Sequence, residues 1–312
     1  MREIKSALIS GASGMIGATL TRLLLQNHIK VYALVRPCSK KIGNLPLGDP
    51  NLTVIACDLN RLPDLIVPGK ELIPHVDAVF HFAWEGAFGE GRNNEPLQER
   101  NVRFTQYLVV LGKKLGARVF IGAGSQAEYG FVSGKLKEDT PLHPVTQYGM
   151  KKHKAAEIGR SIATKEGIDF IWTRILSVYG PYDNDYTLVM SAVNAFLKSE
   201  HIAFTKGEQI WDYLFSEDAA QCFYELAKSG KNGRTYVLGG GNEVPLGDYI
   251  RMIRDSVDPT KEIGFGERPY NENQVMYLSA DISALREDTG YTPSTAFADG
   301  IEKTIRWAKE RG

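Results

Sequence analysis

A tyrosine and a lysine four residues apart are the residues of this sequence best suited to proton transfer. Tyr148 and Lys152 lie in the stretch YGMKK at the start of a predicted helix over 147–166, and residues at this spacing project from one helix face. A free tyrosine has a pKa of ~10, and one ammonium ~4 Å away at an effective dielectric of ~20 supplies the ~4 kcal/mol that would bring it to ~7. The pair predicts a tyrosine acid or base, although the same spacing also occurs in surface helix pairs.

Ser125 is the third candidate member of this site. It lies 23 residues before Tyr148, in the loop GAGSQAEYG (122–130) that follows a predicted strand. Loops at the carboxyl edge of an open parallel sheet bind ligands, although a loop serine also caps turns. The serine lies at the sheet edge where such folds bind ligands, which strengthens the prediction of a site that includes Tyr148 and Lys152.

The stretch GASGMIG (11–17) predicts a phosphate-binding turn. It stands where an apolar strand gives way to an amphipathic helix, the context in which glycines let the backbone approach a pyrophosphate at a helix N-terminus. Without that context, three glycines would indicate only a tight turn. The predicted contacts of a dinucleotide here are Gly11, Ser13, Gly14, Met15, Ile16 and Gly17.

The end of the second predicted strand favours NADP over NAD. The chain there reads VRPCSKK (35–41), without the acidic residue that binds the ribose of NAD. Arg36 is suited to the 2′-phosphate of NADP, helped by Ser39 or Lys40, but an arginine here can also stack on adenine or remain solvated. NAD therefore stays the alternative. Asp58 and Leu59, after the third strand, are candidates for the adenine, although a loop aspartate also caps turns.

Short apolar runs alternating with helical stretches predict the scaffold of this site. The runs cover 7–9, 31–35, 52–56, 78–80, 119–121 and 170–175, and such alternation is typical of a parallel sheet with helices on both faces. We predict a Rossmann-type, doubly wound α/β domain over 1–180, to which about 207–235 return. A smaller C-terminal α/β domain over most of 181–312, with short strands and two or three helices, is expected to bind the substrate.

Composition narrows the classes of partner. Lys and Arg total 37, as do Asp and Glu, so the net charge gives no sign of nucleic acid or an anionic membrane as partner. Cys38, Cys57 and Cys222 lack paired spacing, and the six histidines lack metal-ligand spacing. We therefore expect no metal site. Since no apolar run approaches ~18 residues and the N-terminus leads directly into a strand, we expect a cytoplasmic protein.

With these motifs in order along nearly the whole chain, the sequence resembles the extended short-chain dehydrogenases/reductases, the group of nucleotide-sugar epimerases, dehydratases and 4-keto reductases. The stretch HFAW (81–84) resembles the family's HxAA, and NVRFT (101–105) resembles its NxxxT. The stretches RILSVYGP (174–181) and WDYLFSED (211–218) resemble RxxNxYGP and RDFxxVxD. Arg268-Pro269 and Ala280-Asp281 resemble the C-terminal RPGD and AD pairs.

The resemblance implies a role for each matching residue. Tyr148 would exchange a proton with a sugar hydroxyl or ketone, Ser125 would hydrogen-bond the reacting oxygen, and Lys152 would hold the nicotinamide ribose and lower the tyrosine pKa. Further cofactor contacts would be Phe82, Ala83, Trp84 and Asn101, together with Tyr148 and Lys152. Substrate contacts would be Trp84, Gln126, Ser177, Trp211 and Arg268, the last with a substrate phosphate.

The sequence departs from the family pattern at two places. Dehydratases carry an acid and a base where this chain has Gln126 and Ala127, and Glu128 is one residue off, so dehydration is disfavoured. The usual phosphate-binding arginine is Trp211 and the usual asparagine is Ser177, a change that costs ~1.5–3 kcal/mol of binding unless another cation compensates. Candidates to compensate are Lys198, Lys206 and Arg268.

The leading functional hypothesis is an NADP-dependent reductase that acts on a keto-sugar carried by a nucleoside diphosphate. The alternative enzyme is a nucleotide-sugar 4-epimerase with tightly held NAD, and the alternative of another class is a noncatalytic NADP-binding regulatory protein. By analogy with related enzymes, we expect the helices over 95–116 and 147–166 to pair with their twins in a homodimer.

Overall fold

The computed structural model describes residues 1–66, 73–272 and 274–311, and a parallel sheet of seven strands forms its centre. The strand order is β11-β6-β5-β4-β1-β2-β3, in which the chain extends the sheet outward from β1 on both sides, as in a doubly wound Rossmann-type fold. All six strands predicted from the sequence lie in this sheet, so the predicted fold class is confirmed. The strands are β1 (Ser6–Ser10), β2 (Lys30–Val35), β3 (Leu52–Ala56), β4 (Ala78–His81), β5 (Val119–Ala123), β6 (Asp169–Ile175) and β11 (Thr235–Leu238).

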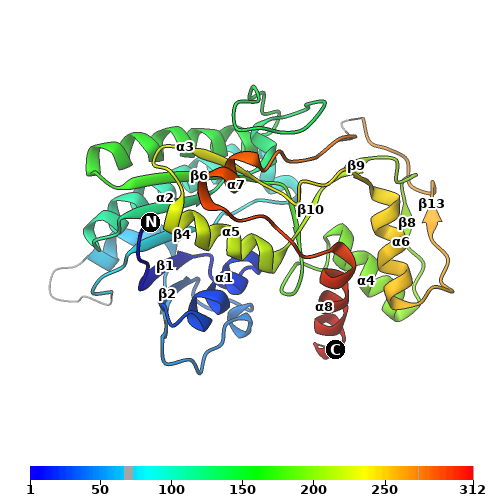
Figure 1. The fold of residues 1–312 in the computed structure, drawn as a ribbon, viewed down its shortest axis with the longest axis horizontal. Coiled ribbons are helices and arrows are strands. Elements are labelled where there is room, and N and C mark those ends of the chain that lie inside the picture. Colours follow the sequence, from blue (N-terminus) through cyan, green and yellow to red (C-terminus); the bar gives the residue numbers. More distant parts are fainter. Residues whose placement is uncertain (67–72, 273, 312) are drawn as a thin grey trace.

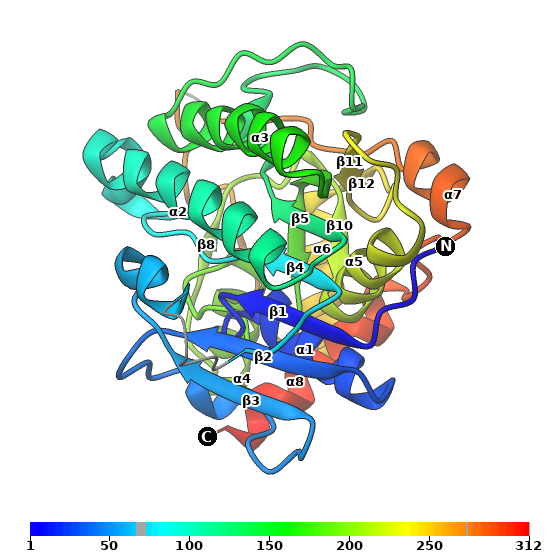
Figure 2. The same cartoon turned by 90° about the vertical axis from the view of Figure 1, so that its left-hand side faces the viewer.

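Helices cover both faces of the sheet (Figure 2). Helices α1 (Met15–Gln26) and α5 (Ser216–Ser229) pack on one face, and α2 (Glu95–Lys114) and α3 (Gln147–Glu166) pack on the other. Successive strand residues point to opposite faces. In β1, Ile9 contributes to the core under α1 and α5, and Leu8 to the core under α2 and α3. Because both faces are buried, the strands are continuous apolar runs.

Capping residues set the ends of the two helices that matter for the site. Helix α3 begins after Thr146, whose hydroxyl accepts a hydrogen bond from the Gly149 amide at 3.2 Å, and it ends at Gly167 in the left-handed conformation. The predicted range 147–166 is therefore confirmed. Helix α2 begins after Asn94, whose side chain accepts from the Leu97 amide, and it ends at Lys114 rather than at 116.

The C-terminal part forms a lobe beside the sheet, at the right of Figure 1. Its core joins α4, α6 and α8 through apolar side chains such as Phe196, Ile250 and Ile305. Five helices, rather than two or three, follow residue 181 in the described chain: α4 (Leu188–Lys198), α5, α6 (Leu246–Val257), α7 (Ser283–Thr289) and α8 (Phe297–Glu310). The short strands are β7 (Ser177–Tyr179), β8 (Ala203–Phe204), β9 (Ile210–Trp211), β10 (Tyr213–Phe215), β12 (Val244–Pro245) and β13 (Gly264–Phe265).

The chain crosses between the two parts more than once. After β10 it returns through α5, which packs on α1, to β11, which pairs with β6. The expected domain limits at 180 and 181 stay a prediction. Short 3₁₀ turns lie at Ile42–Asn44, Leu59–Ile66, Gly89–Asn93 and Gln126–Glu128.

Two general features bear on function. Among the helices that the structure describes, none has the length and apolar character needed to cross a membrane. Within the same described residues, no three His, Cys, Asp or Glu side chains come together in a way that could hold a metal ion.

Candidate active site

A cavity of about 940 Å³ lies between the sheet and the C-terminal lobe. Its sheet side consists of residues that follow β1, β4 and β5, such as Gly11, Phe82 and Ser125, together with the start of α3. Its other side consists of residues of the lobe, such as Trp211 and Arg268. The carboxyl edge of an open parallel sheet is where such folds bind ligands.

The glycine turn opens backbone toward this cavity. Gly11 has a φ of +72°, and a Cβ on it would lie 2.7 Å from the Ala83 amide nitrogen. A Cβ on Gly17 would lie 2.3 Å from the Gly11 carbonyl oxygen. No side chain caps the N-terminus of α1 at Gly14, so its amides and dipole are available to an anion. The residues at this turn therefore fit the pyrophosphate of a dinucleotide.

Of the residues predicted at the turn, Gly11, Gly14, Met15, Ile16 and Gly17 line the cavity. Ser13 does not line it; its carbonyl accepts a hydrogen bond from the Asn44 side chain at 2.9 Å.

Ser125, Tyr148 and Lys152 line one wall of the same cavity. Tyr148 and Lys152 are buried and come from the first two turns of α3, and Ser125 precedes the 3₁₀ turn after β5. The Ser125 hydroxyl accepts a hydrogen bond from the Ala127 amide at 3.2 Å and interacts with the Tyr148 hydroxyl. Since that amide uses only a lone pair of the serine oxygen, the hydroxyl proton is left for the Tyr148 oxygen, at the wall of the cavity.

Lys152 is held close to the ring of Trp84. Its Nζ donates a hydrogen bond to the Ala123 carbonyl and lies 3.8 Å from the centroid of the Trp84 ring. It lies 5.7 Å from the centroid of the Tyr148 ring. Burial lowers the pKa of the Lys152 ammonium to about 7, and the charge of Glu128 acts in the opposite direction.

The structure corrects the electrostatic prediction for Tyr148. Burial raises the pKa of the phenol, and the interaction with Ser125 and the charge of Arg92 counteract burial only in part. The sequence argument expected Lys152 to lower this pKa to ~7, and that direction is wrong for the chain by itself. The physical reason is desolvation, which the spacing of two residues on a helix does not reveal.

Glu128 is part of the scaffold and not an acid or base of the cavity. Its carboxylate is fully buried and accepts hydrogen bonds from the Ser125 amide at 2.9 Å, from the Trp172 indole at 3.0 Å and from Arg174 Nε at 3.1 Å. With Ser125 it forms a capping box that fixes the turn. Glu128 does not line the cavity.

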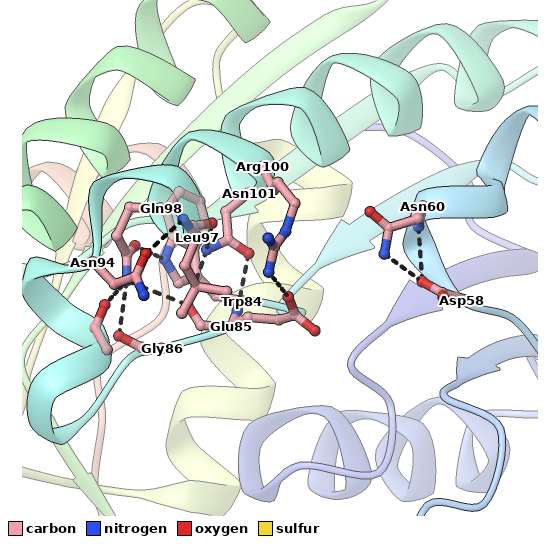
Figure 3. A network of polar contacts seen from close by, with 11 residues as sticks. Asp58, Asn60, Trp84, Glu85, Gly86, Asn94, Leu97, Gln98, Arg100 and Asn101 are labelled. Carbon is pink, nitrogen blue, oxygen red and sulfur yellow. Dashed lines mark hydrogen bonds and ion pairs between the residues drawn. The ribbon is translucent and has the colours of Figure 1, made fainter.

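A polar network on α2 holds the loop that carries Trp84 (Figure 3). The Trp84 indole donates to the Gln98 side chain at 2.7 Å. Asn101 exchanges two hydrogen bonds of 2.9 Å with the backbone of Glu85. Phe82 and Trp84 line the cavity, whereas Ala83 and Asn101 do not. Asn101, predicted to contact the cofactor, thus positions the loop beside the cavity.

The residues predicted at the adenosine end lie outside the cavity lining. Arg36 and Lys40 are exposed after β2, and Ser39 Oγ accepts from the Lys41 amide at 3.3 Å. Asp58 accepts from the amide and side chain of Asn60, at 2.9 and 2.8 Å (Figure 3). These contacts lower the pKa of Asp58. Leu59 is buried in the core. The direct roles of these residues stay predictions.

Trp211 and Ser177, the two departures from the family pattern, contact one another. The Trp211 indole nitrogen donates to Ser177 Oγ at 2.8 Å, and both residues line the cavity with Gln126 and Arg268. Where the family has an arginine and an asparagine that bind the substrate, this chain therefore has a tryptophan and a serine that bind each other. Of the cations proposed to compensate, Arg268 lines the cavity and Lys198 and Lys206 do not.

Among the charged residues in the described cavity lining, sequence reasoning missed Arg92 and Asp183. Arg92 lines it, and its guanidinium carbon lies 4.4 Å from the centroid of the Tyr148 ring. Asp183 is the only acidic residue that lines the cavity among those the structure describes. Its carboxylate accepts hydrogen bonds from the Asn184 amide and the Thr187 hydroxyl. Burial raises the pKa of Asp183 to about 6. No periodicity or motif in the sequence marks either residue.

The glycine turn at the end of β1 and the wall of Ser125, Tyr148 and Lys152 line one cavity on a Rossmann-type sheet. The chain belongs to the NAD dependent epimerase/dehydratase family, whose model matches residues 7–239. It is therefore an enzyme of the extended short-chain dehydrogenase/reductase type, and the resemblance inferred from the sequence is confirmed.

Individual relatives agree with this placement. The chain is 25% identical to an uncharacterised UDP-glucose epimerase of Bacillus subtilis, over 96% of each chain. It is also 25% identical to CDP-abequose synthase of Salmonella typhimurium, over 96% of this chain and 97% of that one. Its fold is similar to that of UDP-N-acetylglucosamine 4-epimerase from Methanobrevibacter ruminantium, with a TM-score of 0.89 and 22% identity over the whole of both chains.

Proposed function

We propose that the protein is a reductase that converts a keto group of a nucleoside-diphosphate sugar to an alcohol. The observation that carries the proposal is the composition of the cavity wall. Tyr148 lies beside Ser125 and Lys152 there, and the positions of the dehydratase acid and base hold Gln126 and Ala127. Asp183, the one acid in the described lining, is already hydrogen-bonded twice. The wall therefore suits a reaction that needs one proton donor.

The residues of the chain divide the work on the carbonyl oxygen. Tyr148 donates its hydroxyl proton to the oxygen, and Ser125 donates a hydrogen bond to the same oxygen. The glycine turn would hold the pyrophosphate of a reduced nicotinamide dinucleotide, which would supply the hydride for the carbonyl carbon. Lys152, on the same helix face as Tyr148, binds the adjacent ribose.

The coenzyme we propose is NADP. Support comes from the end of β2, where Arg36 and Lys40 are exposed and no acid stands. The test is the pair of dissociation constants for NADPH and NADH in the parent chain and in Arg36→Glu. We expect the parent to prefer NADPH and the variant to lose that preference. Equal affinity for both coenzymes in the parent would refute NADP as the coenzyme.

The nucleotide part of the substrate is proposed from the relatives. Their names carry UDP-glucose, CDP-abequose and, for a 26% identical dehydratase of Streptomyces antibioticus, dTDP-glucose. In the cavity, Arg268 is the cation of the lobe suited to a substrate phosphate, and Trp211 offers an aromatic ring. The sugar and the base stay open.

The test of the function is net consumption of NADPH with a panel of keto nucleotide sugars. We expect Tyr148→Phe to reduce kcat by at least about 100-fold, because a positioned acid contributes about 10²–10⁴. A second candidate, a 4-epimerase, is favoured by the named epimerase relative. Bound NAD in the purified protein, with epimerised product and no net coenzyme turnover, would establish the epimerase and refute the reductase.

A noncatalytic NADP-binding role makes the opposite prediction. If Tyr148→Phe leaves every measured oxidoreduction at the parent rate, the site has no catalytic tyrosine and the regulatory alternative stands. Coenzyme binding in that variant, followed by thermal shift, serves as the control that the glycine turn is intact.

We also propose a homodimer through α2 and α3. These two helices pack against each other, and the side chains of Tyr107 and Met150 on them are exposed. Light scattering tests the proposal, and a monomeric mass would refute it.

A cytoplasmic location is proposed as well. It is supported by Cys38 and Cys222, which are free thiols, as is usual in a reducing compartment. Recovery of the protein in a membrane or exported fraction of its host cell would refute this location.

A further inference from the structure

Arg92 occupies a position beside Tyr148 that nothing in the family motifs assigns. It belongs to the 3₁₀ turn Gly89–Asn93, is half-buried and lines the cavity. Its guanidinium carbon lies 4.4 Å from the centroid of the Tyr148 ring, and its Nη1 donates to the Ala87 carbonyl at 3.0 Å. A planar cation at this distance from an aromatic ring is held by the ring and by charge.

The loop that carries Arg92 is tied down by α2. The side-chain amide of Gln98 donates to the carbonyls of Gly86 and Gly91, both at 2.8 Å. A Cβ on Gly91 would lie 2.8 Å from the Gly86 Cα, so the two halves of the loop touch. Such a doubly bonded loop holds its arginine in one place instead of letting it sample solvent.

A second tie connects this loop directly to the helix of the tyrosine. The Asn93 side chain accepts a hydrogen bond from the Gln147 amide at 3.3 Å. Asn93 follows Arg92 and Gln147 precedes Tyr148, so the arginine and the phenol are fixed relative to each other through adjacent backbone. This hydrogen bond therefore ties the backbone beside Arg92 to the first residue of α3.

The other charged groups around Tyr148 leave Arg92 a distinct role. On α3 itself, the Lys152 ammonium is directed to the Ala123 carbonyl and the Trp84 ring. From the turn after β5, Glu128 raises the pKa of Tyr148, but its carboxylate is bound by Arg174. Among the described charged groups, Arg92 is the cation whose charge lowers the Tyr148 pKa.

We propose that Arg92 is a positioning residue of the active site, which acts through Tyr148 by holding its ring and stabilising the negative charge left on its oxygen. The inference rests on the proposed function. In that reaction the O–H bond of Tyr148 breaks, the proton goes to the substrate oxygen and the phenolate remains. The guanidinium beside the ring offsets that charge before a proton returns from solvent.

The first test measures the phenol without any substrate. Tyr148 alone is replaced by a fluorinated tyrosine, whose phenol titrates at lower pH than tyrosine. The other 13 of the 14 tyrosines carry no fluorine, so the single fluorine signal reports on position 148. The titration is recorded in the otherwise intact chain and with Arg92→Gln or Arg92→Lys. A cation about 4–6 Å away lowers such a pKa by about 1–3 units. Because Arg92 is half-exposed, water weakens its effect, and we expect Arg92→Gln to raise the midpoint of the phenol titration by about one unit. Arg92→Lys keeps the charge and should give less than half of that shift.

The matched control is Arg100→Gln. Arg100 pairs with Glu85 at 3.6 Å on the same loop, and its loss should leave the midpoint unchanged. A midpoint for Arg92→Gln within about 0.2 units of the parent value would overturn the proposal. Circular dichroism and coenzyme binding establish that each variant is folded, and Arg92→Met, which also removes the charge, provides the answer if Arg92→Gln does not fold.

The second test uses turnover. With saturating coenzyme, we expect Arg92→Gln to shift the Tyr148 limb of the pH–rate profile to higher pH and to lower kcat about tenfold, with KM for the nucleotide sugar changed less than threefold. A raised KM with an unshifted profile would instead make Arg92 a substrate ligand and overturn the proposal. Because the fluorine titration needs no substrate, its result stands whether or not the reductase is found.

Discussion

Replacement of Glu128 by alanine tests the claim that this carboxylate is structural. Glu128 is fully buried and serves three donors, namely the Ser125 amide, the Trp172 indole and Arg174 Nε. Arg174 is itself buried, with 8% of its side chain exposed. Glu128→Ala leaves the guanidinium with the Glu138 carbonyl, at 2.9 Å, and the Tyr129 side chain, both of them neutral groups.

The magnitude follows from what stays behind. Removal of one partner of a buried ion pair costs about 3–5 kcal/mol, because the other charge remains buried without compensation. The indole that loses its acceptor would by itself cost about 1–3 kcal/mol. The two costs share one carboxylate and do not add, so we expect the free energy of unfolding to fall by about 4 kcal/mol. That is a large share of the usual 5–15 kcal/mol.

Urea unfolding of the full chain measures this loss, as a lower midpoint at an unchanged slope. Glu157→Ala is the matched control, because Glu157 is exposed and pairs with His153 at 3.6 Å, so its loss should stay within about 0.5 kcal/mol. Glu128→Gln keeps an acceptor and should cost less than the alanine. A fall of less than about 1.5 kcal/mol for Glu128→Ala would refute the structural reading of the buried pair.

Three further outcomes are expected. Gly17→Ala places a Cβ 2.3 Å from the Gly11 carbonyl oxygen, so the turn must shift, and coenzyme affinity measured by nicotinamide fluorescence should fall at least tenfold. Burial lowers the pKa of His81 to about 3, so the stabilisation present above about pH 6.5 should be lost as pH falls toward 3. The slope is about 1.4 kcal/mol per pH unit, and urea unfolding should find it absent in His81→Gln. Burial lowers the pKa of Lys152 to about 7, so binding of the anionic coenzyme at pH 8 should take up a proton. Calorimetry in two buffers detects that proton, and Lys152→Met should abolish it.

The fold was predictable because its strands, helix ends and glycine turn each have a recognisable local sequence pattern. The strands are apolar runs since both sheet faces are buried. Helix α3 has a capping threonine and a terminal glycine at its two ends, which explains why its predicted limits hold. Gly11 and Gly17 could be recognised as a phosphate turn for the same reason, since a positive φ and a close approach both require glycine.

The electrostatics of the site were not predictable from the same marks. Arg92 and Tyr148 lie 56 residues apart and meet only through the packing of a 3₁₀ turn on α3. The hydrogen bond between Trp211 and Ser177 likewise joins two distant segments. The sign of the Tyr148 pKa shift depends on burial, and residue spacing carries no information about how much water the fold removes.

The position of β11 late in the sequence has a consequence for folding during synthesis. This strand comes from residues beyond 234, yet it completes the sheet beside β6. Arg2, near the start of the chain, also binds both Asp169 at the start of β6 and the Gly230 carbonyl before β11. During synthesis, β6 therefore stays an open edge, able to pair with other nascent chains, until about sixty further residues have left the ribosome. Translation that pauses in this interval should favour aggregation, and a chaperone acting here would shield β6.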